Sequence, residues 1–223
     1  MTQYGRAPAD SLRHRRADRQ KKSPRFLMLA FPMLAFLASV LAPLAAQAQD
    51  APDPLCAACH NPDGNSIIPE YPKLAGLDAV YIAKQIRDFK NYKRVSEIMG
   101  PMSGRIAEAD IGALAAYFSG QKRTPGIVAD RGLAAQGQLI YDEGVDSTAV
   151  PACSGCHEKD GSGSKKFPRL AGQHTAYLIS QLNNFKTGVR NNDARMRAVV
   201  RRLTDQEIKA VAEYVAGLKG DDQ

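Results

Sequence analysis

The stretch Cys-Ala-Ala-Cys-His occupies residues 56–60, and Cys-Ser-Gly-Cys-His occupies residues 153–157. Together these two stretches contain all four cysteines of the 223-residue chain. Cys-x-x-Cys-His is the attachment motif of a c-type haem, whose vinyl groups bond to the two thiols and whose iron is bound by the histidine. The spacing suits this chemistry, because the thiols reach two neighbouring vinyl groups and the next residue lies under the iron. The motifs therefore predict two haem c groups, attached at Cys56, Cys59, Cys153 and Cys156 and bound through iron by His60 and His157.

Three other roles for the cysteines fit the sequence less well. A thioredoxin-like redox pair belongs to a strand–helix–strand pattern, which neither flank shows. Four thiolates could bind one zinc ion, but the adjacent histidines would then have no role and the two pairs lie in separate repeats. A disulfide within Cys-x-x-Cys closes a small, strained ring. The repetition of the whole five-residue motif favours haem.

The N-terminus has the pattern of a secretory signal peptide. Basic residues at 13–25 precede an apolar stretch at 26–45, and Ala-Gln-Ala at 46–48 provides a small-x-small cleavage site. We therefore expect residues 1–48 to be a cleaved signal peptide and the rest of the chain to lie in the periplasm. A retained membrane anchor is the alternative, since the apolar run is nearly long enough to span a bilayer.

The charge of the chain is concentrated in this N-terminal segment. The whole sequence has a net charge of +7, whereas residues 49–223 contain 22 Lys and Arg against 21 Asp and Glu, a net charge of +1. The composition of the exported part therefore gives no support to nucleic-acid binding. Its 175 residues form one ordinary domain or two small ones.

The exported part is an internal duplication. Cys56 corresponds to Cys153 at an offset of 97, residues 71–76 correspond to 167–172 at an offset of 96, and Met99 corresponds to Met196 at 97 again. This repeat predicts one domain at residues 49–120, a linker at 121–130 that contains proline and glycine, and a second domain at 131–223.

The hydrophobic pattern of both halves predicts helices and no strand. Apolar residues recur at helical spacing near residues 77–91 and 173–187, and again at 111–118 and 208–215. Thr204 and Glu207 have the spacing of a capping box, which predicts that the last helix starts there. Residues 131–144 predict a helix before the second motif, with Gly137 allowing close crossing. The first half has only residues 49–55 before its motif and is expected to lack this helix.

Each iron needs a ligand opposite its histidine. Residues 49–223 contain three methionines, and the repeat register pairs Met99 with Met196 but Met102 with Val199. We therefore expect Met99 and Met196 to be the distal ligands and Met102 to be a packing residue. Packing of all three methionines in the core is the alternative. His174 could replace Met196, but its position at a helix start favours a surface role or one near the haem propionates.

The sequence resembles the dihaem cytochrome c4 family over nearly all of residues 54–219. The matching elements are Cys-Ala-Ala-Cys-His-Asn-Pro-Asp-Gly-Asn-Ser at 56–66, Pro-Lys-Leu-Ala-Gly at 72–76 and Pro-Arg-Leu-Ala-Gly-Gln-His at 168–174, followed by the pattern that leads to Met196. The resemblance implies an all-α fold of two tandem class I cytochrome c domains, each wrapped around its haem. It implies a periplasmic carrier that takes electrons from a quinol:cytochrome c reductase to a haem–copper terminal oxidase. It also implies that the carbonyl groups of Pro72 and Pro168 accept the Nδ1 proton of the proximal histidines.

The sequence favours an electron-transfer protein over an enzyme. A methionine on each iron would close the site that a dihaem peroxidase needs open. The main alternative is an electron-accepting subunit of a dehydrogenase such as a flavocytochrome. Basic positions could form docking patches or ordinary solvated helix faces, and peripheral contact with the membrane is compatible with the sequence. These positions are Lys84, Arg87, Lys90 and Arg94 in the first half, and Arg195, Arg197, Arg201 and Arg202 in the second.

Overall fold

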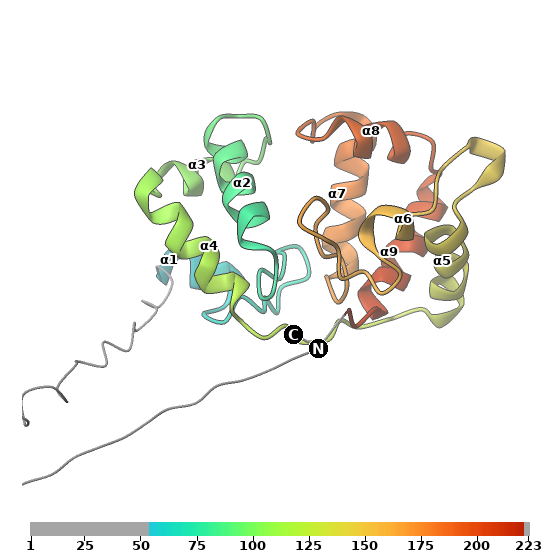
Figure 1. Ribbon diagram of the computed structural model, residues 1–223, viewed down its shortest axis with the longest axis horizontal. Helices are drawn as coiled ribbons and strands as arrows, with labels where there is room; N and C mark the ends of the chain where they lie inside the picture. Colours follow the sequence, from blue (N-terminus) through green and yellow to red (C-terminus); the bar gives the residue numbers. More distant parts are fainter. Residues whose placement is uncertain (1–53, 221–223) are drawn as a thin grey trace, which may run out of the picture. The chain divides into compact units, whose positions relative to one another are not determined.

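The computed structural model describes residues 54–220, so the predicted signal peptide lies outside the described residues. The helices of the first half appear in Figure 1 in blue to green. They are α1 (Pro54–His60), α2 (Ala79–Lys90), α3 (Met99–Gly104), the 3₁₀ turn η1 (Glu108–Asp110) and α4 (Ile111–Ser119). Each predicted helix of this half is present, and α1 and α3 are further ones that the hydrophobic pattern did not indicate.

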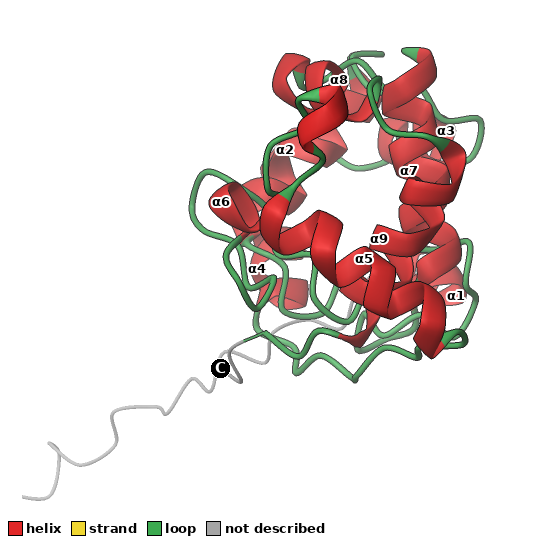
Figure 2. Cartoon of the chain, turned by 90° about the vertical axis from the view of Figure 1, so that its right-hand side faces the viewer, coloured by secondary structure: helices red, strands yellow, loops and turns green. Residues whose placement is uncertain are grey.

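The second half repeats the order of the α-helices after one additional helix and a 3₁₀ turn and, among its described residues, has no counterpart of η1. Its elements are α5 (Arg131–Glu143), η2 (Asp146–Thr148), α6 (Ser154–His157), α7 (Thr175–Thr187), α8 (Ala194–Val200) and α9 (Asp205–Gly217). The described residues contain helices, loops and isolated bridges but no strand, as Figure 2 illustrates, so the predicted all-α class is confirmed. Within residues 54–220, every helix is too short or too polar to cross a bilayer.

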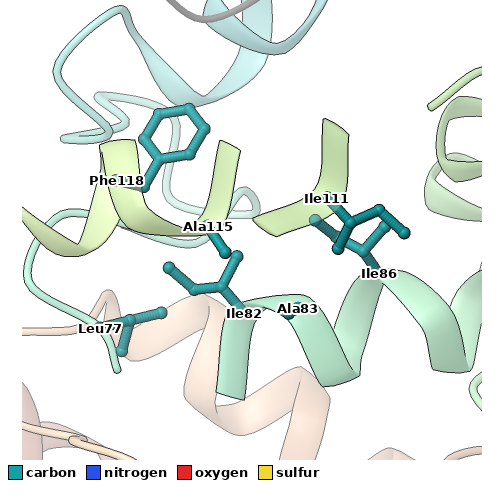
Figure 3. Close-up of a cluster of buried hydrophobic side chains, with 7 residues drawn as sticks. All are labelled: Leu77, Ile82, Ala83, Ile86, Ile111, Ala115 and Phe118. Carbon is teal, nitrogen blue, oxygen red and sulfur yellow. The ribbon is translucent and has the colours of Figure 1, made fainter. Parts of the chain in front are cut away.

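The core of the first half lies where α2 meets α4. Asp78 begins α2 by accepting a hydrogen bond from the Tyr81 backbone N–H at 2.9 Å. Figure 3 shows the buried side chains between the two helices. They are Leu77, Ile82, Ala83, Ile86, Ile111, Ala115 and Phe118. Their spacing of three and four residues explains why the helical pattern was readable from sequence.

The second half is built around the crossing of α5 and α9. A Cβ atom at Gly137 would lie 1.9 Å from the backbone oxygen of Ala210, so this crossing requires glycine. Thr204 and Glu207 form the predicted capping box at the start of α9. A counterpart of α5 in the first half would precede the first motif, within residues 49–55. Of these, only Pro54 and Leu55 are described, and they belong to α1, so the expectation that the first half lacks this helix stays a prediction.

The two halves share a tight loop after each Cys-x-x-Cys-His motif. Gly64 and Gly161 have positive φ angles of 72° and 74°, and their carbonyl groups accept the backbone N–H groups of Ala75 and Ala171 at 3.1 Å. The linker residue Arg123 donates to the carbonyl oxygens of the same two alanines, at 2.9 and 3.1 Å. The Arg123 guanidinium therefore links the equivalent loops of both repeats through hydrogen bonds.

Candidate haem-binding site

A cavity of about 1680 Å³ runs through both halves of the chain. All the candidate haem residues line it, together with apolar side chains of both cores. These candidates are Cys56, Cys59, His60, Pro72, Met99, Cys153, Cys156, His157, Pro168 and Met196. The fold therefore gathers residues that lie up to 140 positions apart in the sequence.

The two histidines have the same orientation in their halves. Nδ1 of His60 lies 2.9 Å from the carbonyl oxygen of Pro72, and Nδ1 of His157 lies 2.9 Å from that of Pro168. Because a carbonyl only accepts, each Nδ1 carries the proton and each Nε2 retains its lone pair. Burial lowers the pKa of both imidazoles, against a smaller opposing effect of the proline carbonyl. Both rings are therefore kept in the neutral form that binds a metal.

The residue after each histidine has a positive φ angle. Asn61 has φ 60° and Glu158 has φ 65°, a region that residues other than glycine rarely adopt. The aromatic residue of the following loop then contacts the imidazole. The ring centroids of His60 and Tyr71 are 6.4 Å apart, and those of His157 and Phe167 are 6.0 Å apart.

The two methionines also share their local structure. The Met99 backbone N–H donates to Oγ of Ser96 at 3.1 Å, and the Met196 N–H donates to Oδ1 of Asp193 at 3.1 Å. Each methionine therefore lies in the first turn of its helix, three residues after a polar side chain that accepts its N–H. Asp193 is the N-cap of α8, whereas the N-cap of α3 is Ile98, which makes no side-chain cap bond. Met102 lines the same cavity one turn further along α3.

The structure contains a buried polar cluster at the contact between the halves, which the sequence did not predict. Nη2 of Arg94 donates to Oη of Tyr177 at 2.8 Å and to Oε1 of Gln181 at 2.6 Å. The equivalent residue of the second half, Arg190, makes the reciprocal bonds, since its Nη2 donates to Oη of Tyr81 at 3.1 Å and to Oε1 of Gln85 at 3.3 Å.

Both guanidinium groups of this cluster are buried over aromatic rings. Arg94 lies over Phe89 and Arg190 over Phe185, at 4.5 and 4.4 Å from the ring centroids. Arg94 is only 6 % exposed, so it cannot belong to the docking patch considered for the first half. The matched offsets of the tyrosine and glutamine partners were the signal in the sequence that could have indicated the cluster.

His174 is placed away from the cavity, at the contact between the halves. Its Nε2 lies 2.8 Å from the carbonyl oxygen of Ser66, and it is not among the residues that line the cavity. The side chain of Gln173, its neighbour, accepts from the backbone N–H of Lys73 at 2.8 Å and donates to the Lys73 carbonyl at 2.9 Å.

The residues present fit two haem groups. The cavity offers two thiols, a neutral imidazole and a thioether in each half, within apolar walls. Arg94 and Arg190 also line it, and buried guanidinium groups suit the carboxylates of a haem. A zinc site does not fit, because within residues 54–220 no three His, Cys, Asp or Glu side chains come together as a metal-binding group.

Comparison with known proteins agrees with this geometry. The family model for cytochrome c matches residues 46–122 and again residues 134–219, so the chain contains two tandem cytochrome c domains. A cytochrome c4 from Thiocapsa roseopersicina is 46% identical over 169 residues, which span 74% of this chain and 87% of that protein. The crystal structure of reduced recombinant cytochrome c4 from Pseudomonas stutzeri is 38% identical, with a TM-score of 0.71 over 74% of this chain and 94% of that one.

The chain therefore belongs to the cytochrome c4 family, and it is an electron-transfer protein with two haem c groups rather than an enzyme. A second kind of relative is also similar to it. A protein from Stutzerimonas stutzeri named thiosulfate dehydrogenase electron acceptor is 35% identical over 169 residues, or 73% of this chain and 78% of that protein.

Proposed function

We propose that the chain is a periplasmic carrier that moves electrons by outer-sphere transfer between two haem sites and external redox proteins. The first site consists of Cys56, Cys59, His60 and Met99, and the second of Cys153, Cys156, His157 and Met196. The observation that carries the proposal is that all eight side chains line one cavity, with both imidazoles hydrogen-bonded through Nδ1 to a proline carbonyl. Bound haem supplies a one-electron iron couple at each site.

The residues of the chain have separate tasks in this function. The thiols hold the group covalently, so a change of redox state does not release it. The carbonyl groups of Pro72 and Pro168 fix the tautomer and orientation of the imidazoles. The thioethers of Met99 and Met196 would bind the haem iron together with the imidazoles, which would leave no position for a substrate and would raise the reduction potential. The apolar walls exclude water, which favours fast transfer with little rearrangement.

The proposed domain organisation follows the repeat. Residues 1–48 are a cleaved signal peptide, 49–120 the first cytochrome domain, 121–130 the linker and 131–223 the second domain. Export places the carrier in the periplasm, with a quinol:cytochrome c reductase as donor and a haem–copper terminal oxidase as acceptor. The similarity to a thiosulfate dehydrogenase electron acceptor favours a second candidate, in which a periplasmic dehydrogenase is the donor.

Spectra of methionine variants test the proposed ligands. The mature protein from a host that attaches haem should gain the mass of two haems, and its oxidised form should show the near-red band of sulfur bound to iron. Met99→Ala and Met196→Ala should each remove about half of this band, since each supplies one of two ligands. Met102→Ala is the matched control and should leave the band in place. If Met102→Ala removes the share of the first domain instead, the assignment of Met99 is wrong.

Kinetics with purified partners separate the two candidate functions. A carrier of the respiratory chain is reduced by the quinol:cytochrome c reductase and delivers two electrons per molecule to the oxidase. A dehydrogenase acceptor is reduced rapidly by the thiosulfate dehydrogenase in the presence of thiosulfate and only slowly by the reductase. Peroxide turnover by the reduced protein would refute both.

A further inference from the structure

Five exposed basic side chains surround the part of the cavity that belongs to the second half. Lys166 and Arg195 line the cavity itself, and the other three lie on α8 or directly after it. All five are exposed to solvent, and the Arg195 side chain is 68% exposed. We call this set the basic surface, and its members are Lys166, Arg195, Arg197, Arg201 and Arg202.

Contacts within the second half hold the basic surface beside the proposed iron ligand. The guanidinium of Arg195 lies 4.9 Å from the ring centroid of Phe167, the residue after Lys166. That ring contacts the imidazole of His157. Arg202 donates to the carbonyl oxygen of Ala149 at 2.7 Å, which fixes it against the loop before α6. The positive charges therefore lie close to the second haem site rather than on a distant face.

Few negative charges offset this surface. Oδ2 of Asp193 lies 3.3 Å from Nη2 of Arg195, and an exposed pair of this kind contributes little. Asp205, near the start of α9, is paired with Lys186 at 2.7 Å. Arg197 and Arg201 are four residues apart, so they share a helix face at a separation where like charges repel. The repulsion between these two side chains is unfavourable for the folded domain.

The internal duplication allows the charge of the basic surface to be compared with that of the equivalent positions in the first half. At the offsets of the repeat, the equivalent positions in the first half are Glu70, Ile98, Gly100, Gly104 and Arg105. These five positions have no net charge, whereas the basic surface has a charge of +5. Glu70 and Ile98 line the cavity just as Lys166 and Arg195 do. The difference is therefore located at the same place relative to each haem site.

Three other basic positions of the first half add little free charge beside its haem site. Lys84 forms an ion pair with Asp88, and Arg87 lies 2.5 Å from Glu108. Arg94 is buried at the contact between the halves. Exposed apolar side chains occupy this rim instead, with Val95 at 59% and Ile98 at 49% exposure.

We propose that the basic surface docks an acidic redox protein against the second half, and that the first half does not bind such a partner. This inference rests on the proposed carrier function and names the partner of its second site. In the complex, the bound haem would accept one electron from the reduced metal centre of the partner, so the partner would be oxidised and the haem iron reduced. Complementary charge accelerates encounter by steering the two proteins together.

Charge reversal of two exposed residues tests the docking. The holoprotein variant Lys166→Glu/Arg201→Glu changes the net charge by −4 on the basic surface. The matched control Lys122→Glu/Arg131→Glu makes the same change at exposed residues that do not line the cavity. A reduced plant-type [2Fe–2S] ferredoxin serves as the acidic probe, and hydroquinone serves as an uncharged reductant. Stopped-flow spectra give the reduction rates, and calorimetry of the two oxidised proteins gives the dissociation constant.

The proposal predicts a specific pattern at low ionic strength, where the Debye length is about 30 Å. The surface variant should lose about tenfold or more in the rate with ferredoxin and a similar factor in affinity. The control should lose much less, and 1 M salt should remove the difference. Hydroquinone should reduce all forms equally, which shows that both haems still accept electrons. A protein that hydroquinone cannot reduce would refute the carrier function instead.

Three results would overturn the docking proposal. Equal ferredoxin rates for all forms would show that the basic surface is not used. Equal losses in the surface variant and the control would show that the net charge of the molecule governs association. Binding of the wild type but not the surface variant to anionic phospholipid vesicles, with unchanged ferredoxin rates, would assign the surface to a membrane.

Discussion

Replacement of Gln173 by alanine should loosen the contact between the two halves at a calculable cost. The Gln173 amide is 5% exposed and makes two bonds with the Lys73 backbone, at 2.8 and 2.9 Å. Each is worth about 1 kcal/mol net, and a buried N–H left without a partner costs about 1–3 kcal/mol. The Lys73 carbonyl keeps a bond from Arg123 at 3.3 Å. The backbone N–H groups of Lys73 and His174 both donate to Oε1 of Gln173, so both lose this acceptor. The expected loss is about 2–4 kcal/mol.

Denaturation of the holoprotein by guanidinium chloride, followed by helix circular dichroism, measures this loss. Gln138→Ala is the control, because Gln138 is an exposed residue of α5 and its change should stay within about 0.5 kcal/mol. The near-red spectrum of Gln173→Ala should be unchanged, since Gln173 binds the backbone rather than a proposed iron ligand. A loss for Gln173→Ala no larger than that of the control would refute the argument that this amide joins the halves.

Three further changes test other parts of the structure. Gly137→Ala forces α5 away from a backbone oxygen of α9 and should destabilise the protein by about 3 kcal/mol in thermal unfolding, whereas Gly112→Ala, with open space around it, should not. Asp193→Ala removes the cap of α8 and should cost about 1 kcal/mol, seen as earlier loss of half the near-red band on heating. His174→Gln should cost about 1 kcal/mol at pH 7.5 and less at pH 5.

The sign of the His174 prediction follows from its environment. Burial is the largest cause that lowers its pKa below 6.5, and the Ser66 carbonyl opposes it. The unfolded state therefore binds a proton more readily than the folded state. The stabilisation is fully present above pH 6.5 and is lost as the pH falls through and below that value. Unfolding free energies of the wild type and His174→Gln from pH 5 to 8 measure it, and a difference between the two proteins that grows toward pH 5 would contradict the assignment.

The helices and the duplication could be predicted from the sequence because both depend on local signals. Apolar residues at helical spacing in 111–118 gave α4, and the spacing of Thr204 and Glu207 gave the start of α9. The short helix α3 was missed, since Met-Gly-Pro-Met-Ser-Gly at 99–104 has two glycines and a proline and no helical pattern. This helix is positioned by its contacts with α2, which no local pattern encodes.

The buried arginines could not be predicted for a different reason. A long cationic side chain is expected at the surface, and Arg94 was grouped with Lys84, Arg87 and Lys90 on that basis. Its burial depends on oxygen acceptors from the other half, Tyr177 and Gln181, which lie more than 80 residues away. Partners at such separations are visible only once the chain has folded, although the repeat shows that both halves contain the same set.

The pattern of similarity between the halves distinguishes structural from functional positions. The proposed iron ligands and the arginines of the buried cluster match at the offsets of the repeat, as Met99 matches Met196 and Arg94 matches Arg190. Both copies bind the same covalent cofactor and contribute to one reciprocal contact, so the same side chains are required at these positions in each copy. Exposed positions at the edge of the cavity, such as Ile98 and Arg195, are not required by the cofactor or by the contact between the halves. These are the positions at which the two halves differ in charge. A duplicated carrier can therefore keep two equivalent redox centres while each end is adapted to a different partner.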